Sequence, residues 1–239
     1  MKAYSATDVG KVRKVNQDTV FCSTDPVGNL PNLFIVADGM GGHKAGDLAS
    51  RLTVETVVDM VQSLDDSDPI TLIGKAIHRA NEVVLGKARE AEEFNGMGTT
   101  VVVSCIKDGM LYVANVGDSR LYVINKGIKQ ITRDHSLVEE LVSMGQLDRK
   151  EARTNKNKNI ITRAVGGMKV VMADYFEIQL EEKDMILMCT DGLTNMVEDE
   201  EIMGLVKQKA SIEVRVANLI QSANNHGGRD NVGVILVES

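Results

Sequence analysis

Four aspartates stand where short apolar, strand-like runs begin or end, and each lies beside a glycine or a glycine pair: Asp38, Asp118, Asp191 and Asp230. Strand ends of a compact fold can bring residues that are far apart in sequence to one point. Carboxylates that converge repel one another, so a shared site needs cations to neutralise it. Oxygen ligands favour hard ions such as Mg²⁺ or Mn²⁺ over zinc. The pattern therefore predicts a strand-rich fold with a metal site at one end.

A single Asp-Gly pair is a weaker signal, because this pair also favours tight β-hairpin turns. Asp108-Gly109, between the apolar runs 101–106 and 111–116, is interpreted as only such a turn. Asp38 differs because it opens the glycine-rich stretch Met40-Gly41-Gly42-His43 ahead of a helical segment. The prediction of a metal site depends on the set of aspartates and not on one member.

Short strand candidates recur along the chain, several of them separated only by tight turns. Strands joined in this way are expected to pair antiparallel. The candidates lie at 3–8, 19–22, 33–37, 99–106, 111–116, 121–124, 128–132, 172–178, 185–190 and 232–237. The four between residues 99 and 132 are expected to form antiparallel meanders.

Helical periodicity marks the stretches 45–61 and 70–84, with Pro69 in the first turn of the second. Further helices are expected near 199–207 and 211–224, the last capped by Ser211, and a polar helical excursion runs from 135 to about 158. A helix with one apolar face must pack on something. The expected fold is therefore α+β, with two sheets facing each other and helices outside.

Composition narrows the choice of function. The chain has 239 residues and no Ser/Pro/Gly-rich linker, which favours one domain over 1–239. Its net charge of −7 argues against a nucleic-acid partner. Three widely spaced cysteines without CxxC spacing indicate buried thiols in a reducing compartment. With no apolar run near the roughly 18 residues of a membrane span and no secretory signal, we expect a soluble, cytoplasmic chain without a membrane partner.

A basic and polar segment, Arg13-Lys14-Val15-Asn16-Gln17-Asp18, follows a turn at Gly10. An arginine offers a planar fork that binds phosphate through paired hydrogen bonds. Taken alone, this segment is more simply interpreted as a solvated loop, because charged residues are mostly exposed. Beside a cluster of metal-binding carboxylates, we interpret Arg13 as directed at a phosphate.

Taken together, the motifs resemble those of the PPM-type (type 2C-like) metal-dependent Ser/Thr protein phosphatases, and the bacterial branch most closely. They run in order from near residue 7 to near residue 237: Arg13-Lys14-Val15-Asn16-Gln17-Asp18, Ala37-Asp38-Gly39-Met40-Gly41-Gly42-His43, Gly98-Thr99-Thr100, Val116-Gly117-Asp118-Ser119-Arg120, Asp134-His135-Ser136, Cys189-Thr190-Asp191-Gly192-Leu193 and Gly228-Arg229-Asp230-Asn231. The resemblance implies a four-layer α-β-β-α sandwich, two antiparallel sheets flanked by antiparallel helix pairs. It also implies hydrolysis of phosphoserine and phosphothreonine monoesters on proteins by a metal-activated water.

The resemblance further implies roles for individual residues. Arg13 would hold the substrate phosphate, and two core Mn²⁺ or Mg²⁺ ions with a third, weaker ion would be held by oxygen ligands. These ligands would be Asp38 as the bridge, the Gly39 carbonyl, Asp191, Asp230, Asp118 with Asp191 at the third ion, and Asp18 through water. No covalent phosphoenzyme is expected, because two cations can orient a water for direct attack.

The proton donor to the leaving group is a point where this chain departs from part of the family. Eukaryotic members carry a histidine directly after the Asp-Gly pair, and this chain has Met40 there. A thioether cannot donate a proton. His43, three residues on, is the nearest titratable replacement, with metal-bound water as the alternative.

The segment 135–163 matches the position of the variable flap near the active site of these enzymes. Its basic residues are Arg153, Lys156, Lys158 and Arg163. A solvated loop is the simpler interpretation. The sharper hypothesis is that the flap guides acidic phosphoproteins to the site.

The resemblance suggests a monomer that acts on phosphorylated proteins and opposes a cognate Ser/Thr kinase. A metal-dependent phosphodiesterase or nuclease also uses carboxylate-held ion pairs, but the acidic charge and the ordered motifs argue against it. A binding module that has lost turnover is a further alternative. It would be expected to lack metal aspartates, whereas this chain has them all.

Overall fold

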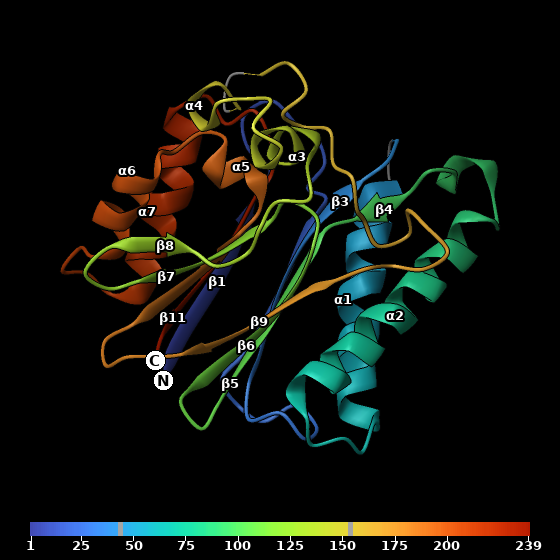
Figure 1. The fold of residues 1–239 in the computed structure, drawn as a ribbon, viewed down its shortest axis with the longest axis horizontal. Coiled ribbons are helices and arrows are strands. Elements are labelled where there is room, and N and C mark those ends of the chain that lie inside the picture. The colour runs from blue at the N-terminus through green and yellow to red at the C-terminus, as the bar shows by residue number, and fades with distance from the viewer. Residues whose placement is uncertain (43–44, 153–154) are drawn as a thin grey trace.

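Two antiparallel sheets face each other in the computed structural model, which describes residues 1–42, 45–152 and 155–239 (Figure 1). The first sheet has the order β1-β11-β10-β7-β8. The second has the order β2-β3-β5-β6-β9, and the short β4 pairs with the end of β3. In chain order the strands are β1 Lys2–Asp8, β2 Asp18–Ser23, β3 Leu33–Met40, β4 Gly98–Thr99, β5 Val101–Lys107, β6 Met110–Val116, β7 Arg120–Ile124, β8 Ile128–Gln130, β9 Asp174–Gln179, β10 Met185–Cys189 and β11 Val232–Glu238.

Helices cover the outer face of each sheet (Figure 1). α1 (Ala45–Ser63) and α2 (Pro69–Ala88) pack on the second sheet, and α6 (Asp199–Val206) and α7 (Ile212–Asn225) pack on the first. Shorter helices are η1 Glu92–Phe94, α3 Leu137–Ser143, α4 Arg149–Ala152 and α5 Asp191–Thr194. The expected α+β sandwich of four layers is confirmed.

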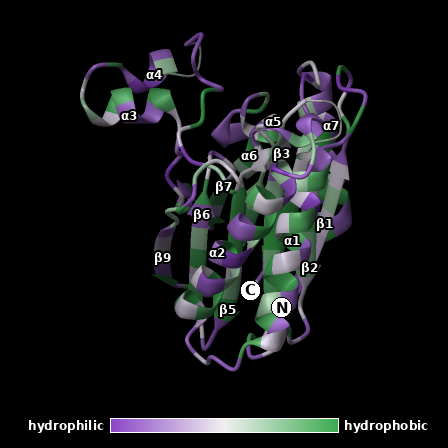
Figure 2. Ribbon diagram, turned by 90° about the vertical axis from the view of Figure 1, so that its right-hand side faces the viewer, coloured by the Kyte–Doolittle hydropathy of each residue, from purple (hydrophilic) through white to green (hydrophobic). Residues whose placement is uncertain are grey.

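The layers are held together by apolar side chains that alternate along the strands. Strand residues point to opposite faces in turn, so one set packs between the sheets and the other packs under the helices. Between the sheets lie buried residues from both, including Phe34, Leu111, Leu121, Met188 and Ile235. Figure 2 shows many apolar residues on the strands and along α1, while α3 and α4 project from this body as a small lobe.

The meander expected between residues 99 and 132 is only partly correct. β5–β6 and β7–β8 are antiparallel neighbours, and Asp108-Gly109 forms the turn of the first pair with positive φ at both residues. β6 and β7, however, lie in opposite sheets. The turn at Gly117, where φ is +106°, carries the chain from one sheet to the other. The strands therefore bury apolar side chains against each other face to face, which a sequence pattern alone does not distinguish from edge pairing.

Other differences are local. The polar excursion after residue 135 contains two short helices, α3 and α4, instead of one helical stretch. Asp191 begins the four-residue helix α5, which was not among the expected helices. Ser211 is the N-cap residue of α7, as expected, but its side chain makes no capping hydrogen bond.

The chain ends and the aspartates lie at opposite ends of the sandwich. Figure 1 places both termini at the lower end, and β4, α5 and the turn after β3 at the upper end. Within the described ranges, no helix is long and apolar enough to cross a membrane. The loops of the upper end, drawn from the whole length of the chain, position the candidate site.

Candidate metal centre

Asp18 and Asp38 are brought together by strand pairing. They face each other across the antiparallel pair β2–β3. The backbone of Asp38 is fixed by two threonines: Thr100 Oγ1 accepts from the Asp38 N–H at 3.0 Å, and Thr99 Oγ1 donates to the Asp38 carbonyl at 2.8 Å. Gly39 has no room for a side chain, because a Cβ there would lie 2.0 Å from the Gly46 carbonyl oxygen of α1. The turn that carries Asp38 is therefore held tightly in place.

Three other aspartates reach the same end from the ends of neighbouring elements. Asp191 follows β10 and starts α5, Asp230 precedes β11, and Asp118 lies in the turn between β6 and β7. Thr190, which follows β10, links β2 to β11. Its Oγ1 donates to Asp18 Oδ2 at 2.8 Å and accepts from the Gly233 N–H at 2.8 Å. The fold thus brings residues from near both ends of the sequence into one site.

A pocket of about 230 Å³ collects most of the predicted site residues. Its lining includes Arg13, Asp38, Gly39, Asp118, Asp191 and Asp230. Asp18 does not line this pocket but lies buried beside it, 8% exposed. The structure therefore brings together every described residue that the sequence predicted for the site.

Burial and mutual repulsion raise the pKa values of four of the aspartates: Asp18, Asp38, Asp118 and Asp191. Burial raises the pKa of Asp18 from 3.8 to about 8, and the charges of Asp191 and Asp230 act in the same direction. Burial, with the charge of Asp230, raises the pKa of Asp191 from 3.8 to about 6. The pKa of Asp38 and that of Asp118 are also raised, by burial first and then by neighbouring aspartates. Such a cluster is costly unless protons or cations neutralise it.

Arg13 pairs with the carboxylate of Asp230 across 217 positions of sequence. Its Nη2 donates to Asp230 Oδ2 at 2.8 Å, and its side chain is 51% exposed. Guanidinium carries five N–H donors in a planar fork, so one such contact leaves others for a second anion. Arg13 thus reaches the edge of the carboxylate cluster from the solvent side.

The donor set fits divalent cations. It consists of oxygen atoms, which hard ions prefer, and the buried Asp18 Oδ1 has no hydrogen-bond partner. In the ranges that the structure describes, no three acidic, histidine or cysteine side chains are grouped closely enough to hold an ion as they stand. Protein donors contact part of the set instead: Arg13 contacts Asp230, Thr190 contacts Asp18, and Asn195 Nδ2 donates to Asp191 Oδ2 at 2.7 Å. These donors hold the carboxylates in place at the pocket.

Supporting residues were only partly visible in the sequence. Asn231 Oδ1 accepts from the Gln17 N–H, and its Nδ2 donates to the carbonyls of Val9 and Val15, so it ties the Arg13 segment to the Asp230 loop. Thr190 and Asn195 were not predicted. Thr190 lies in the motif around Asp191, whereas Asn195 lies two residues beyond it and had no sequence signal.

Two residues named in the predictions, His43 and Arg153, lie outside the described residues. Met40 lines the pocket, as its position after Gly39 requires. In the flap segment, Lys156 is exposed and Lys158 donates to Asn195 Oδ1 at 3.0 Å. Arg163 instead contacts Asp174 at 2.8 Å, so its charge is neutralised within the protein.

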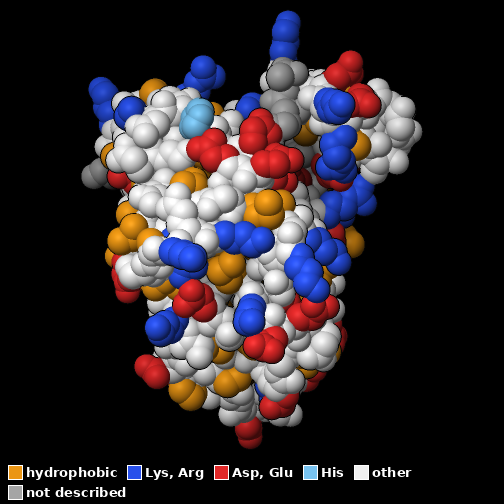
Figure 3. Space-filling view, turned by 90° about the vertical axis from the view of Figure 1, so that its left-hand side faces the viewer, with side chains coloured by type: hydrophobic (Ala, Val, Ile, Leu, Met, Phe, Trp, Pro, Cys, Tyr) orange, Lys and Arg blue, Asp and Glu red, His pale blue; other side chains and the backbone are white. Residues whose placement is uncertain are grey.

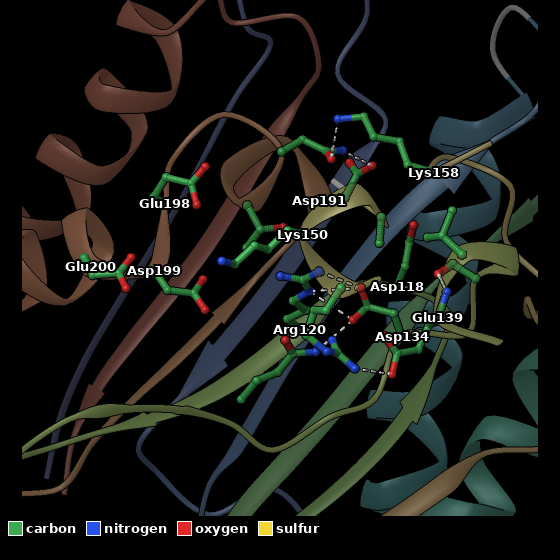
Figure 4. A pocket seen from close by; sticks show the side chains of 17 residues that line it. Asp118, Arg120, Asp134, Glu139, Lys150, Lys158, Asp191, Glu198, Asp199 and Glu200 are labelled. Atoms are coloured by element: carbon green, nitrogen blue, oxygen red, sulfur yellow. Dashed lines mark hydrogen bonds and ion pairs between the residues drawn. The ribbon is translucent and has the colours of Figure 1, made fainter. Parts of the chain in front are cut away.

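A second cavity of about 330 Å³ lies beside the first and shares Asp118 and Asp191 with it (Figure 4). Its walls come from α3 and α4 on one side and from α5 and the start of α6 on the other. Arg120 donates to both carboxylate oxygens of Asp134, and Arg149 donates to Glu139. Seen from the α6–α7 side, acidic side chains gather beside the hollow under the α3–α4 lobe (Figure 3).

Comparisons with known proteins agree with this arrangement. The family model described as "Protein phosphatase 2C" matches residues 10–229. The serine/threonine phosphatase stp of Listeria welshimeri is 39% identical over 245 residues, covering 100% of this chain and 96% of the relative. The crystal structure of the serine/threonine phosphatase Stp1 from Staphylococcus aureus has a TM-score of 0.93 at 36% identity, covering 100% of this chain and 94% of that one.

A further solved structure, the catalytic domain of the serine/threonine protein phosphatase PstP in complex with two manganese ions, has a TM-score of 0.87 at 28% identity. It covers 99% of this chain and 97% of that one. With its fold, its ordered motifs and these relatives in agreement, the chain belongs to the protein phosphatase 2C family and is a Ser/Thr protein phosphatase of the bacterial type.

Proposed function

We propose that this chain hydrolyses phosphoserine and phosphothreonine monoesters on proteins at a centre of two Mn²⁺ or Mg²⁺ ions. Asp38, the Gly39 carbonyl, Asp191 and Asp230 would hold the ions, and Asp18 would act through water. The observation that carries this proposal is the pocket that four carboxylates line together with Arg13. The two manganese ions of the PstP structure support the choice of cation class.

When bound, the cations would supply activation of a water and neutralisation of phosphate charge. The protein residues supply position and electrostatics. Arg13 can turn free N–H groups toward the transferring phosphoryl oxygens and offset their charge. Its contact with Asp230 fixes the guanidinium at the rim of the pocket. No nucleophilic side chain is needed, so retention of configuration at phosphorus would contradict this route.

The leaving alkoxide needs a proton, and Met40 cannot provide one. We propose His43 as the donor. The test is His43→Ala, assayed with an aryl phosphate and with a phosphopeptide. A proton donor matters more for the poorer leaving group, so the loss should be larger with the phosphopeptide. Equal losses on both substrates would remove His43 from the mechanism.

Several finer assignments accompany this proposal. Asp118 with Asp191 would hold a third, weaker ion, because both carboxylates line the two neighbouring cavities. Residues 1–239 would form one domain, with 135–163 as a flap that guides phosphoproteins through exposed charge such as Lys156. The protein would act as a monomer that opposes a cognate Ser/Thr kinase.

The deciding experiment is phosphate release from a phosphothreonine peptide with Mn²⁺, with Mg²⁺ and with EDTA. Activity with either cation and none with EDTA is expected. A parallel assay with bis(p-nitrophenyl) phosphate, a diester, tests the phosphodiesterase alternative. Turnover of the diester but not of the phosphopeptide would contradict the proposal. Manganese binding without turnover of either substrate would favour a binding module.

A further inference from the structure

Asn195 lies between a proposed metal ligand and a lysine from a distant part of the chain. Its backbone N–H donates to the Asp191 carbonyl at 2.7 Å, and its side-chain Nδ2 donates to Asp191 Oδ2 at 2.7 Å. On the other side, Asn195 Oδ1 accepts from Lys158 Nζ at 3.0 Å. Figure 4 draws both side-chain contacts as dashed lines between the labelled Lys158 and Asp191.

The chemistry of the three groups fixes the direction of this bridge. A lysine ammonium only donates hydrogen bonds, and an ionised carboxylate only accepts them. A side-chain amide offers an acceptor on one side and donors on the other, so it can join the two. The oxygen of Asn195 must therefore face Lys158 and its nitrogen must face Asp191.

The bridge connects two segments that lie far apart in the sequence. Lys158 lies in a turn between α4 and β9, 37 residues from Asn195, and is half-buried although lysines are mostly exposed. Lys158, Asn195 and Asp191 all line the larger of the two cavities. Asn159 of the same turn lines the smaller pocket, together with Asp38, Arg13 and Asp191.

We propose that Asn195 is a positioning residue for Asp191 and that Lys158 in turn positions Asn195. The affinity of the centre for cations then depends on where the Lys158 turn lies. Binding linkage makes the coupling reciprocal, so a loaded centre holds that turn in place. This inference rests on the proposed function, because it takes Asp191 as a metal ligand.

The first test is Mn²⁺ affinity of the full chain, measured by isothermal titration calorimetry without substrate. Loss of a residue that orients a metal ligand typically weakens binding about 10- to 100-fold, and that is the loss expected for Asn195→Ala. Affinity within about twofold of the unmodified protein would overturn the proposal. Thermal unfolding in EDTA checks that the variant is folded.

The second test is a double-mutant cycle between Lys158→Ala and Asn195→Ala. If the lysine acts through the amide, its effect on Mn²⁺ affinity should differ by at least about threefold between the two backgrounds. A purely long-range charge effect would be the same in both and would overturn the coupling. Lys150→Ala is the matched control, because Lys150 lines the same cavity and makes no side-chain contact with Asn195 that the structure shows.

If Asn195→Ala does not fold, the two lysine variants still decide. The fold-change in Mn²⁺ affinity caused by Lys158→Ala should then differ from that caused by Lys150→Ala by at least about threefold. Equal fold-changes would overturn the proposal. Asp191→Asn separates this inference from the function beneath it. Unchanged manganese binding in Asp191→Asn would contradict the proposed metal centre itself. Lost binding in Asp191→Asn with normal binding in Asn195→Ala would contradict only the role of Asn195.

Discussion

The two neighbouring cavities share Asp118 and Asp191 but differ in how their other acidic side chains are paired with basic ones. In the larger cavity, Arg120 binds Asp134 and Arg149 binds Glu139. In the smaller one, four carboxylates converge and Arg13 is the only basic side chain among the described lining residues. Two acidic side chains of the larger cavity thus have arginine partners, whereas in the smaller cavity one arginine, bound to Asp230, accompanies four carboxylates. Buried charge without a protein counterion is a mark of function, because stability alone would remove it.

The sharpest way to break this comparison is Asp38→Asn, which removes one buried charge from the smaller cavity. Phosphatase activity with Mn²⁺ should fall on the order of 10²–10³-fold or more, because a proposed ligand of the ions that stabilise developing charge is lost. In EDTA the same variant should melt a few degrees higher, since one repulsive charge is gone. Activity is followed by phosphate release and stability by calorimetry. Retained activity would contradict the assignment of Asp38.

The next largest effect is expected for Arg13→Ala. Loss of a charge-assisted contact costs about 1.5–3 kcal/mol, so kcat/KM for a phosphopeptide should fall about 10- to 100-fold. Arg13→Lys should recover part of this loss but not all of it, because an ammonium lacks the planar fork. The matched control is Lys14→Ala, an exposed neighbour of equal charge. An equal loss in the control would reduce the Arg13 effect to general electrostatics.

The larger cavity should respond to Asp134→Asn in the opposite manner. Arg120 would lose its charged partner while only partly exposed, so unfolding free energy should fall by about 1–3 kcal/mol. Phosphatase activity of the folded variant should change only about threefold or less. Denaturant unfolding and steady-state kinetics measure the two effects. A loss of activity as large as that of Asp38→Asn would erase the distinction between the two cavities.

The smallest effect is a pH dependence of the metal-free protein. The pKa of Asp18 is raised to about 8, so the folded chain holds more protons than the unfolded chain above pH 3.8. Stability in EDTA should therefore fall as pH rises, and between pH 6.5 and 8 Asp18 contributes to the slope together with Asp38 and Asp118, whose pKa values burial also raises. His135 acts in the opposite direction, because burial lowers its pKa from 6.5 and stability is lost below that value. Asp18→Asn should flatten the slope, and a stability that rises over this interval would contradict the shift.

The layers of the fold could be predicted because local pattern and tertiary role agree there. The strands 232–237 and 185–190 alternate or continue in apolar residues and are central in their sheet, and the helices 45–61 and 70–84 each have one apolar face. The passage of the chain between sheets at Gly117 could not be predicted. A short turn between two apolar strands suits edge pairing and face-to-face packing equally well.

The charged residues of the site could be predicted from the sequence, but the neutral residues that hold them in place could not. Asp38, Asp191 and Asp230 stood out as acidic residues at strand ends. Thr190 and Asn195 did not, because hydroxyl and amide side chains are common in turns and show their role only through their partners. The position of Lys158 was likewise hidden, since a basic residue in a polar segment is most simply read as solvated.

The contact between Arg13 and Asp230 has a consequence for refolding. Closing a chain segment of 217 residues loses much conformational entropy before any local contact repays it. The helical hairpin of α1 and α2 depends on near neighbours in sequence and should form early. After dilution from denaturant, secondary structure should therefore return before catalytic competence, with an interval in which the molecule is largely ordered yet chemically inert.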